Sequence, residues 1–221
     1  MEVLVERRLQ ELKETGYRIS IKDYFNGAIE IFKAEAGPFI LFSLLYLAVQ
    51  GLLNFVLENF GLLISIVLSP PLSAGYIFAA HKIRNGEPLY FSDFFQGFKL
   101  ITPLVVSSLI GGAISLLGFI FLIIPGVYFT VAYYMAPFFV VFYGMSGWDA
   151  LEASRKLVHR QWFDVFVFLL AILLIDLLGV ICLGVGLLVA VPITSIMLYL
   201  FFEDVFGLNI KSEDLIDSLG R

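Results

Sequence analysis

Charged side chains are scarce in this chain of 221 residues. Asp, Glu, Lys and Arg together make up 15% of it, whereas hydrophobic residues make up 60%, and the mean hydropathy is +0.94. Soluble domains usually contain about 25% charged and about 45–50% apolar residues. The composition therefore excludes an ordinary soluble domain and predicts an integral membrane protein.

Residues that bind metals or act as nucleophiles are also few. The chain contains one cysteine, Cys182, and two histidines, His81 and His159, which both lie in connections between the predicted spans. A single cysteine cannot form an internal disulfide, and neither histidine has an acid or a cysteine at the spacing of metal ligands. No phosphate loop, nucleophile elbow or zinc-protease motif occurs. We therefore predict a non-enzymatic protein with no catalytic residue, no metal site and no cofactor.

Positive charge is missing from alternate connections between the apolar segments. The net charge of −5 gives no support to nucleic-acid binding, but the positions of the 14 Lys and Arg residues are informative. None lies near residues 58–61, 117–119 or 183–186, and all of them lie in the remaining connections and at the two ends. Since Lys and Arg are retained on the cytoplasmic side, the pattern predicts six crossings with both termini in the cytoplasm.

Six apolar runs are long enough to cross a bilayer, which needs about 20 helical residues. We place them at residues 37–57, 62–80, 103–121, 125–143, 163–181 and 187–202. The predicted fold is all-α, with three helical hairpins in one transmembrane domain over residues 37–202. Residues 1–36 are expected to form cytoplasmic amphipathic segments, the first with Val5, Leu9 and Leu12 on one face. Residues 203–221 are expected to form a cytoplasmic tail, with a further short amphipathic helix at residues 212–219. The charged first 34 residues lack a signal peptide, so we expect the first apolar helix to act as the insertion signal.

A short amphipathic segment precedes each hairpin, and the three segments resemble one another. Each has an acid, then two residues, a polar side chain and a small residue, beginning at Asp23, Asp93 and Asp149. Ser20, Ser92 and Ser146 stand just upstream, where a hydroxyl can cap a helix. This pattern favours a threefold internal repeat of an interfacial helix and a hairpin, although capped helices can also recur by chance.

Aromatic and basic residues gather in these cytoplasmic segments. Rings prefer the headgroup level of a bilayer, and basic side chains are attracted to anionic lipid. We therefore expect the segments to lie in the membrane interface. The candidate contacts to lipid headgroups are Lys99, Arg155, Lys156, Arg160, Trp148 and Trp162.

Polar residues inside the spans form a second candidate site. Asp176 is the one aspartate in the interior of a predicted span, where a carboxylate facing lipid costs about 2.5–3.5 kcal/mol. Two interpretations are open for Asp176, namely an ion, proton or substrate site, and a hydrogen bond between helices. The first span adds a polar stripe with a period of four, which either lines a cavity or packs against the serines of the second span. Its members are Tyr46, Gln50, Asn54 and Glu58.

Three motifs together resemble a known group of proteins. They are Ile123-Ile-Pro-Gly-Val-Tyr128, then Ala136-Pro137, then Ala150-Leu-Glu-Ala-Ser-Arg-Lys-Leu157. This combination resembles a signature of bacterial six-helix membrane proteins of unknown function, which are related to the membrane domain of glycerophosphoryl diester phosphodiesterases. The resemblance implies a six-helix fold in a bacterial inner membrane. It does not imply phosphodiesterase activity, which belongs to a separate soluble domain.

Three functions are compatible with these patterns. The first is an inner-membrane protein that binds lipid or protein partners, including copies of itself, through its interfacial helices. The second is a small transporter or channel with a polar site around Asp176 and Glu58. A membrane-embedded enzyme acting on lipids is the third, and the chain offers no identifiable catalytic group for it.

Overall fold

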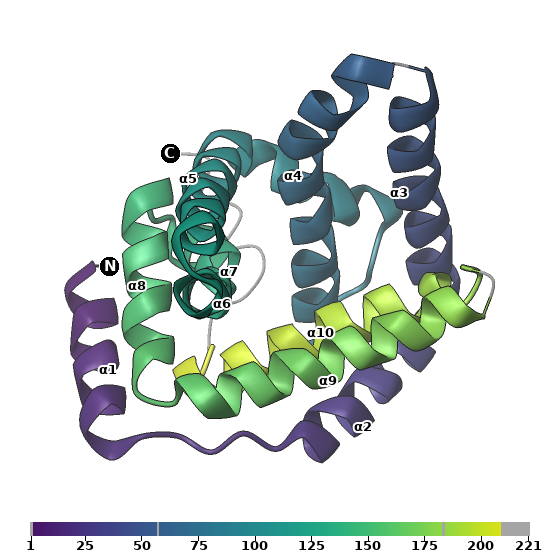
Figure 1. Ribbon diagram of the computed structural model, residues 1–221. Coiled ribbons are helices and arrows are strands. Elements are labelled where there is room, and N and C mark those ends of the chain that lie inside the picture. The colour runs from purple at the N-terminus through teal and green to yellow at the C-terminus, as the bar shows by residue number, and fades with distance from the viewer. Residues whose placement is uncertain (1, 57, 183, 209–221) are drawn as a thin grey trace. The chain divides into compact units, whose positions relative to one another are not determined.

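The computed structural model describes residues 2–56, 58–182 and 184–208, apart from the side chains of residues 2–4, 54 and 58–60. Every regular element in these ranges is a helix, which confirms the all-α prediction (Figure 1). Six helical segments are long and apolar enough to cross a membrane. They are Ala36–Leu53, Gly61–Arg84, Phe91–Phe121, Ile123–Tyr143, Trp162–Ile181 and Leu187–Phe206.

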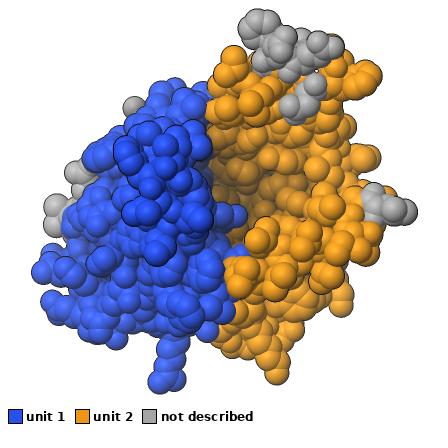
Figure 2. All heavy atoms as spheres, viewed as in Figure 1, with its two compact units in different colours: residues 1–19, 100–169 blue, residues 20–99, 170–221 orange. Residues whose placement is uncertain are grey.

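The chain divides into two compact units (Figure 2). Unit 1 contains Met1–Ile19 and Leu100–Leu169, and unit 2 contains Ser20–Lys99 and Leu170–Arg221. The second boundary falls at the start of the third apolar segment, and the third boundary falls inside the fifth. Hydropathy finds the apolar segments but carries no information on which of them share contacts.

Unit 1 is built around a helical hairpin. Its elements are α1 (Glu2–Thr15), α5 (Ile101–Phe121), α6 (Ile123–Tyr133), α7 (Ala136–Tyr143), α8 (Gly147–His159) and the first residues of α9 (Trp162–Ile181). Helix α5 packs against α6, α8 contacts α5, α6 and α7, and α1 packs on α8. Helices α5 and α6 of the hairpin approach closely where Gly118 faces Gly126, because a β-carbon on Gly118 would lie 2.8 Å from the Gly126 nitrogen. The small residues of α5 thus serve helix packing.

Unit 2 contains α2 (Ile21–Ala34), α3 (Ala36–Val56), α4 (Glu58–Arg84), the 3₁₀ helix η1 (Phe91–Leu100), the later part of α9 and α10 (Leu187–Phe206). Helix α10 packs against α2, α3 and α4. The Phe94 ring of η1 is fully buried and stacks on Phe42 with centroids 4.5 Å apart. Gly75 of α4 and Gly97 of η1 allow these two helices to approach closely, because a β-carbon at either position would overlap the facing backbone.

Several predicted boundaries are wrong by a few residues. The second span extends to Glu58–Arg84, so the expected turn at residues 58–61 is helical, and the turn expected at 117–119 lies at Leu122 instead. The last helix runs to Phe206, beyond the predicted limit of residue 202. Residues 212–219 and the rest of the predicted tail from residue 209 lie outside the described residues.

The fourth span is not one continuous helix. It breaks between α6 and α7 at Tyr134 and Met135, just before Pro137, which cannot donate a backbone hydrogen bond. Ser154 of α8 forms hydrogen bonds with the backbone on both sides of this break. Its hydroxyl donates to the Ala132 carbonyl (2.6 Å) and accepts from the Met135 N–H (3.1 Å). The sequence signature with a second proline and a downstream serine therefore has a structural basis within unit 1.

The three amphipathic segments share their N-terminal capping only in part. The Ser20 and Ser146 side chains accept hydrogen bonds from the N–H groups of Asp23 and Asp149, as predicted. Ser92 instead lies inside η1, and the Asp93 carboxylate accepts the Tyr90 N–H (2.8 Å). In all three segments the acid is nevertheless bonded to the residue three positions before it, which favours the predicted repeat.

Candidate anion-binding cleft between α1 and α8

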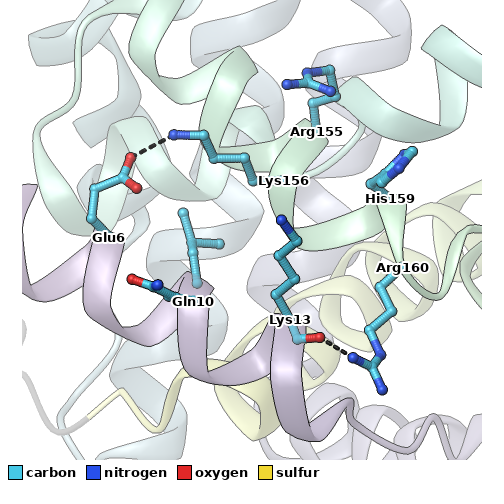
Figure 3. A pocket seen from close by; sticks show the side chains of 8 residues that line it. Glu6, Gln10, Lys13, Arg155, Lys156, His159 and Arg160 are labelled. Atoms are coloured by element: carbon cyan, nitrogen blue, oxygen red, sulfur yellow. Dashed lines mark hydrogen bonds and ion pairs between the residues drawn. The ribbon is translucent and has the colours of Figure 1, made fainter.

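A cleft of about 700 Å³ opens between α1 and α8 in unit 1 (Figure 3). Four of its lining side chains carry a positive charge and one carries a negative charge. The lining consists of Glu6, Leu9, Gln10, Lys13, Arg155, Lys156, His159 and Arg160. With His neutral, these residues sum to three net positive charges.

Helix α8 presents cations to the cleft because its residues divide between two faces. Ala150, Leu151, Ser154 and Leu157 are buried against the rest of unit 1. Arg155 and Lys156 are followed four residues later by His159 and Arg160, and residues four apart lie one above the other on a helix. The basic residues therefore gather on one side of the C-terminal half of α8, where cations also suit the helix dipole.

Helix α1 forms the other wall. Its apolar side chains Val5, Leu9 and Leu12 are buried, as their spacing predicted. The segment after α1 is tied to the end of α8, because the Tyr17 N–H donates to Gln161 (2.7 Å) and the Tyr17 hydroxyl donates to the Leu157 carbonyl (3.1 Å). These contacts leave the polar face of α1, with Gln10 and Lys13, directed at the cleft (Figure 3).

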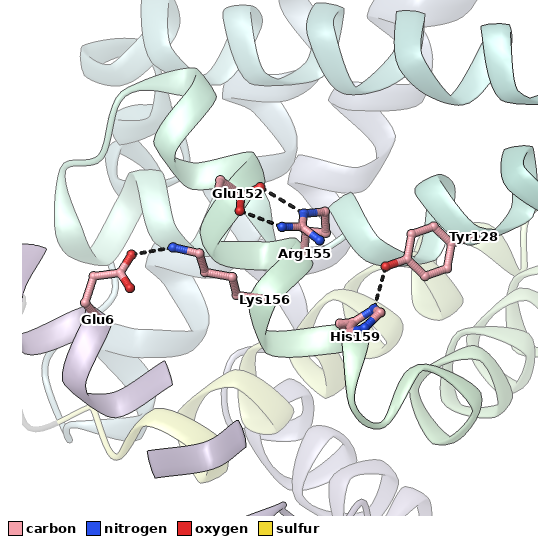
Figure 4. A network of polar contacts seen from close by, with 6 residues as sticks. All are labelled: Glu6, Tyr128, Glu152, Arg155, Lys156 and His159. Carbon is pink, nitrogen blue, oxygen red and sulfur yellow. Dashed lines mark hydrogen bonds and ion pairs between the residues drawn. The ribbon is translucent and has the colours of Figure 1, made fainter. Parts of the chain in front are cut away.

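Partly exposed ion pairs surround the cleft (Figure 4). Lys156 pairs with Glu6 of α1 at 2.7 Å, and Arg155 donates two hydrogen bonds to Glu152 at 2.6 and 2.8 Å. The Arg155 hydrogen bonds hold the pKa of the Glu152 carboxyl below its usual range, and the carboxylate in turn raises the pKa of Arg155. Arg160 donates to the Lys13 carbonyl.

Two of the cations have no acidic partner. No carboxylate of the described residues forms an ion pair with Lys13 or Arg160. Their charge is therefore available to an anion from outside.

A histidine at the inner end of the cleft is fixed by a tyrosine from α6. The Tyr128 hydroxyl lies 2.7 Å from His159 Nδ1 (Figure 4), and the Tyr128 ring stacks on Trp162. The Trp162 indole N–H donates to the Tyr128 carbonyl (3.2 Å). Tyr128 ends the Pro-Gly-x-Tyr motif and Arg155 belongs to the α8 motif, so the two halves of the sequence signature meet beside the cleft.

The chemistry of this lining suits a phosphate group. Arginine and lysine offer several charged N–H donors, and arginine matches the oxygens of a phosphate in a two-pronged geometry. Gln10 and the second ring nitrogen of His159 add neutral groups that can form hydrogen bonds. In the described part of the chain, no cluster of three or more His, Cys, Asp or Glu could hold a metal ion.

The structure brings together three of the six residues that the sequence singled out for headgroup contacts. Arg155, Lys156 and Arg160 line the cleft. Trp148 is 56% exposed at the start of α8, and Trp162 packs on Tyr128. Lys99 is exposed in η1 and belongs to unit 2.

Sequence reasoning missed Lys13, His159 and Gln10. The spacing of four between Arg155 and His159 was a usable signal for one of them. No local pattern indicates that α1 packs on α8, because the residues that meet are 150 positions apart, as in the Glu6–Lys156 pair.

The second predicted site consists of direct contacts between helices wherever it is described. The Thr194 hydroxyl of α10 lies within hydrogen-bonding distance (3.1 Å) of an Asp176 carboxylate oxygen. Gln50 donates to Ser69 of α4 (2.7 Å), and Tyr46 contacts the Tyr76 ring. The side chains of Asn54 and Glu58 lie outside the described part of the structure. The two hydrogen bonds involve different helix pairs, so the proposed transport site stays a prediction.

Comparison of the chain with protein-family models, with curated proteins and with solved structures gave no match. The resemblance to six-helix membrane proteins therefore rests on the motif residues alone.

Proposed function

We propose that this protein is a non-enzymatic bacterial inner-membrane protein that binds the headgroup of an anionic phospholipid in the cleft between α1 and α8. The observation that carries this proposal is the convergence of Lys13, Arg155, Lys156 and Arg160 from two helices on one cleft. We propose a phospholipid as the phosphate-bearing ligand, because unit 1 also contains helices that are long and apolar enough to lie in the hydrocarbon of a membrane.

The electrostatic attraction expected from four basic side chains is large enough for measurable binding of an anionic lipid. Each basic side chain near an anionic leaflet contributes about 1 kcal/mol. Removal of three of the four cations should therefore weaken binding by about 3 kcal/mol, which is on the order of 100-fold. Because the cleft is open to solvent, salt should screen part of this attraction.

The proposed orientation places both termini on the cytoplasmic side and opens the cleft toward that side. Its support is the absence of Lys and Arg from the alternate connections along the sequence. Anionic lipids give the cytoplasmic leaflet its negative surface potential, so this orientation brings the cations to the lipid that they would bind.

A binding experiment tests the proposal. Purified protein in nanodiscs of neutral lipid is titrated with a fluorescent phosphatidylglycerol, and the affinity is compared with that of the triple variant R155Q/K156Q/R160Q. The matched control R7Q/K22Q/K33Q removes the same charge outside the cleft. We expect an approximately 100-fold loss for the cleft variant, a loss below about threefold for the control, and weaker wild-type binding in high salt. Equal losses in both variants would reject a site in the cleft.

A further inference from the structure

Helix α8 does not lie across the end of the α5–α6 hairpin, as an interfacial helix would, but alongside it. Gly147 at its start lies against Val106 and Ser107 of α5, where a β-carbon would be 2.8 Å from the Ser107 nitrogen. One turn later, Leu151 contacts Gly111. At its end, His159 bonds to Tyr128 of α6. Successive turns of α8 therefore contact positions that lie successively nearer to the turn of the hairpin.

These contacts give the depth of α8 relative to the hairpin. Helix α5 has 21 residues, which corresponds to about 31 Å at 1.5 Å per residue, close to the thickness of about 30 Å of the hydrocarbon core. Ser107 is six residues into α5, or about 9 Å. Tyr128 lies only two residues beyond Gly126, which faces Gly118 near the hairpin turn. If α5 and α6 cross the membrane, α8 therefore runs beside the middle of their crossing.

Helix α8 is too polar for that position unless water reaches it. Trp148 and Asp149 near its start are exposed, and Arg155 and Lys156 are about two-fifths exposed. Helix α1, which covers part of α8, has Glu6 and Lys13 on its own exposed surface. Each of these charges would meet the penalty already described for a carboxylate in hydrocarbon, and charged groups at such depth face protein or water-filled spaces.

We propose that α1 and α8 form a hydrated groove along the flank of the α5–α6 hairpin, which extends into the thickness of the membrane. The cleft with Lys13 and Arg160 lies toward its deep end, beside Tyr128. The occupant is a phospholipid whose headgroup lies below the plane of the surrounding headgroups while its acyl chains lie against exposed apolar side chains of α5. Leu109 and Leu116 are such side chains. The groove follows from the packing of α8, and only its occupant rests on the proposed function.

Labelling of single cysteines with a membrane-impermeant maleimide in sealed proteoliposomes tests the groove. In a Cys182→Ser background, Trp148→Cys marks the shallow end of α8, Gln10→Cys marks the cleft, and Leu109→Cys and Leu116→Cys mark the apolar face of α5. Both groove positions should react within about tenfold of a soluble thiol, and both α5 positions at least about 100-fold more slowly. A Gln10→Cys rate as slow as that of Leu116→Cys would overturn the groove.

Leu122→Cys at the hairpin turn provides the depth reference. It should be labelled only from the side opposite to Trp148→Cys. Labelling of both from one side would mean that the hairpin does not cross, and it would overturn the inference as well.

The occupant has a separate readout. Phosphatidylglycerol with a spin label on its headgroup should broaden the signal of a label at Gln10→Cys and leave Trp148→Cys less affected. In the R155Q/K156Q/R160Q variant the broadening should disappear, while maleimide labelling of Gln10→Cys stays fast. Fast labelling without any broadening in the wild type would reject the lipid in the cleft and retain the groove, so the two failures can be told apart.

Discussion

Among the described residues, the most buried ion pair lies in unit 2 and the most exposed one lies in unit 1. In unit 2, Lys82 pairs with Asp93 at 3.0 Å, and only 15% and 6% of their side chains are exposed. Arg84 pairs with Glu203 at 2.9 Å, and Glu203 also accepts the hydroxyl of Tyr199. In unit 1, Lys156 and Glu6 are 39% and 60% exposed, and Lys13 and Arg160 have no described acidic partner.

A chain of hydrogen bonds extends the unit 2 pairs into the protein interior. His81 is fully buried, and its Nδ1 lies 3.1 Å from the Tyr199 hydroxyl. The same hydroxyl donates to Glu203, and His81 Nε2 lies 3.2 Å from the Asn85 amide nitrogen. This chain of hydrogen bonds joins α4 to α10.

The comparison separates structural cations from those available to a ligand. A buried charge whose partner is also buried is satisfied within the fold, and removal of one partner is costly. An exposed pair contributes little to stability, so its charge can be shared with an anion. The same residue types therefore hold helices together in unit 2 and line an open cleft in unit 1.

Breaking the buried pair of unit 2 should have the largest effect on stability. Asp93→Asn leaves the Lys82 ammonium buried without a carboxylate, and we expect a loss of about 3–5 kcal/mol in the free energy of unfolding. Denaturant unfolding in a fixed detergent measures it. Glu30→Gln, an exposed carboxylate on α2, is the control and should change stability by less than about 0.5 kcal/mol. A loss of stability for Asp93→Asn as small as that of the control would show that the buried pair of unit 2 is not structurally more important than the exposed pairs of unit 1.

Removal of one hydroxyl from the buried chain should have an intermediate effect. Tyr199→Phe removes the hydroxyl that bonds to the buried His81 ring and to Glu203, which should cost about 1–3 kcal/mol. Tyr90→Phe, on a largely exposed ring, is the matched control and should be nearly neutral. The same unfolding assay compares the two variants, and equal stability would show that the chain contributes nothing to the contact between α4 and α10.

In unit 1 a single charge should affect binding more than stability. Lys156→Gln removes an exposed pair and should change unfolding by less than about 1 kcal/mol. Its affinity for phosphatidylglycerol should fall about fivefold, the equivalent of about 1 kcal/mol. Both quantities are measured on one nanodisc preparation. A loss of more than about 2 kcal/mol in stability would make this pair structural, like those of unit 2.

The smallest effect is expected from the acid dependence of Glu152. Because Arg155 lowers the pKa of this carboxyl in the folded protein, the unfolded chain takes up its proton first as the pH falls. The stabilisation is therefore complete at neutral pH and is lost below the ordinary glutamate pKa of about 4.3. The difference in stability between wild type and Glu152→Gln should be below about 1 kcal/mol at pH 7 and should vanish by about pH 3. A difference in stability between the two proteins that grows as the pH falls would contradict the lowered pKa of Glu152 in the folded protein.

The elements of the fold could be predicted because each is encoded locally. Apolar length located six crossing segments, the spacing of Val5, Leu9 and Leu12 identified the buried face of α1, and the serines before Asp23 and Asp149 marked helix starts. What could not be predicted is which face meets which partner. Periodicity identifies the apolar side of α8 without showing that it packs along a hairpin.

The same limitation explains the missed residues. His81 was expected in a connection, yet α4 continues past it and buries the ring, because Tyr199, 118 residues later, provides a polar partner. Of the headgroup contacts, Arg155, Lys156 and Arg160 share a local spacing and were recognised. Lys13 depends on the docking of α1, which the sequence does not encode locally.

The docking of α1 on α8 has a consequence for biosynthesis. The apolar face of α1 is made before its cover, because Lys156, the partner of Glu6, is made 150 residues later. At about 5–20 residues per second, α1 waits roughly 8–30 seconds for the helix that will cover it. During that interval the nearest cover for Val5, Leu9 and Leu12 is the membrane surface. Helix α1 can therefore reach its final place only after α8 has been made, and slowed translation between α1 and α8 should prolong its exposure to proteases.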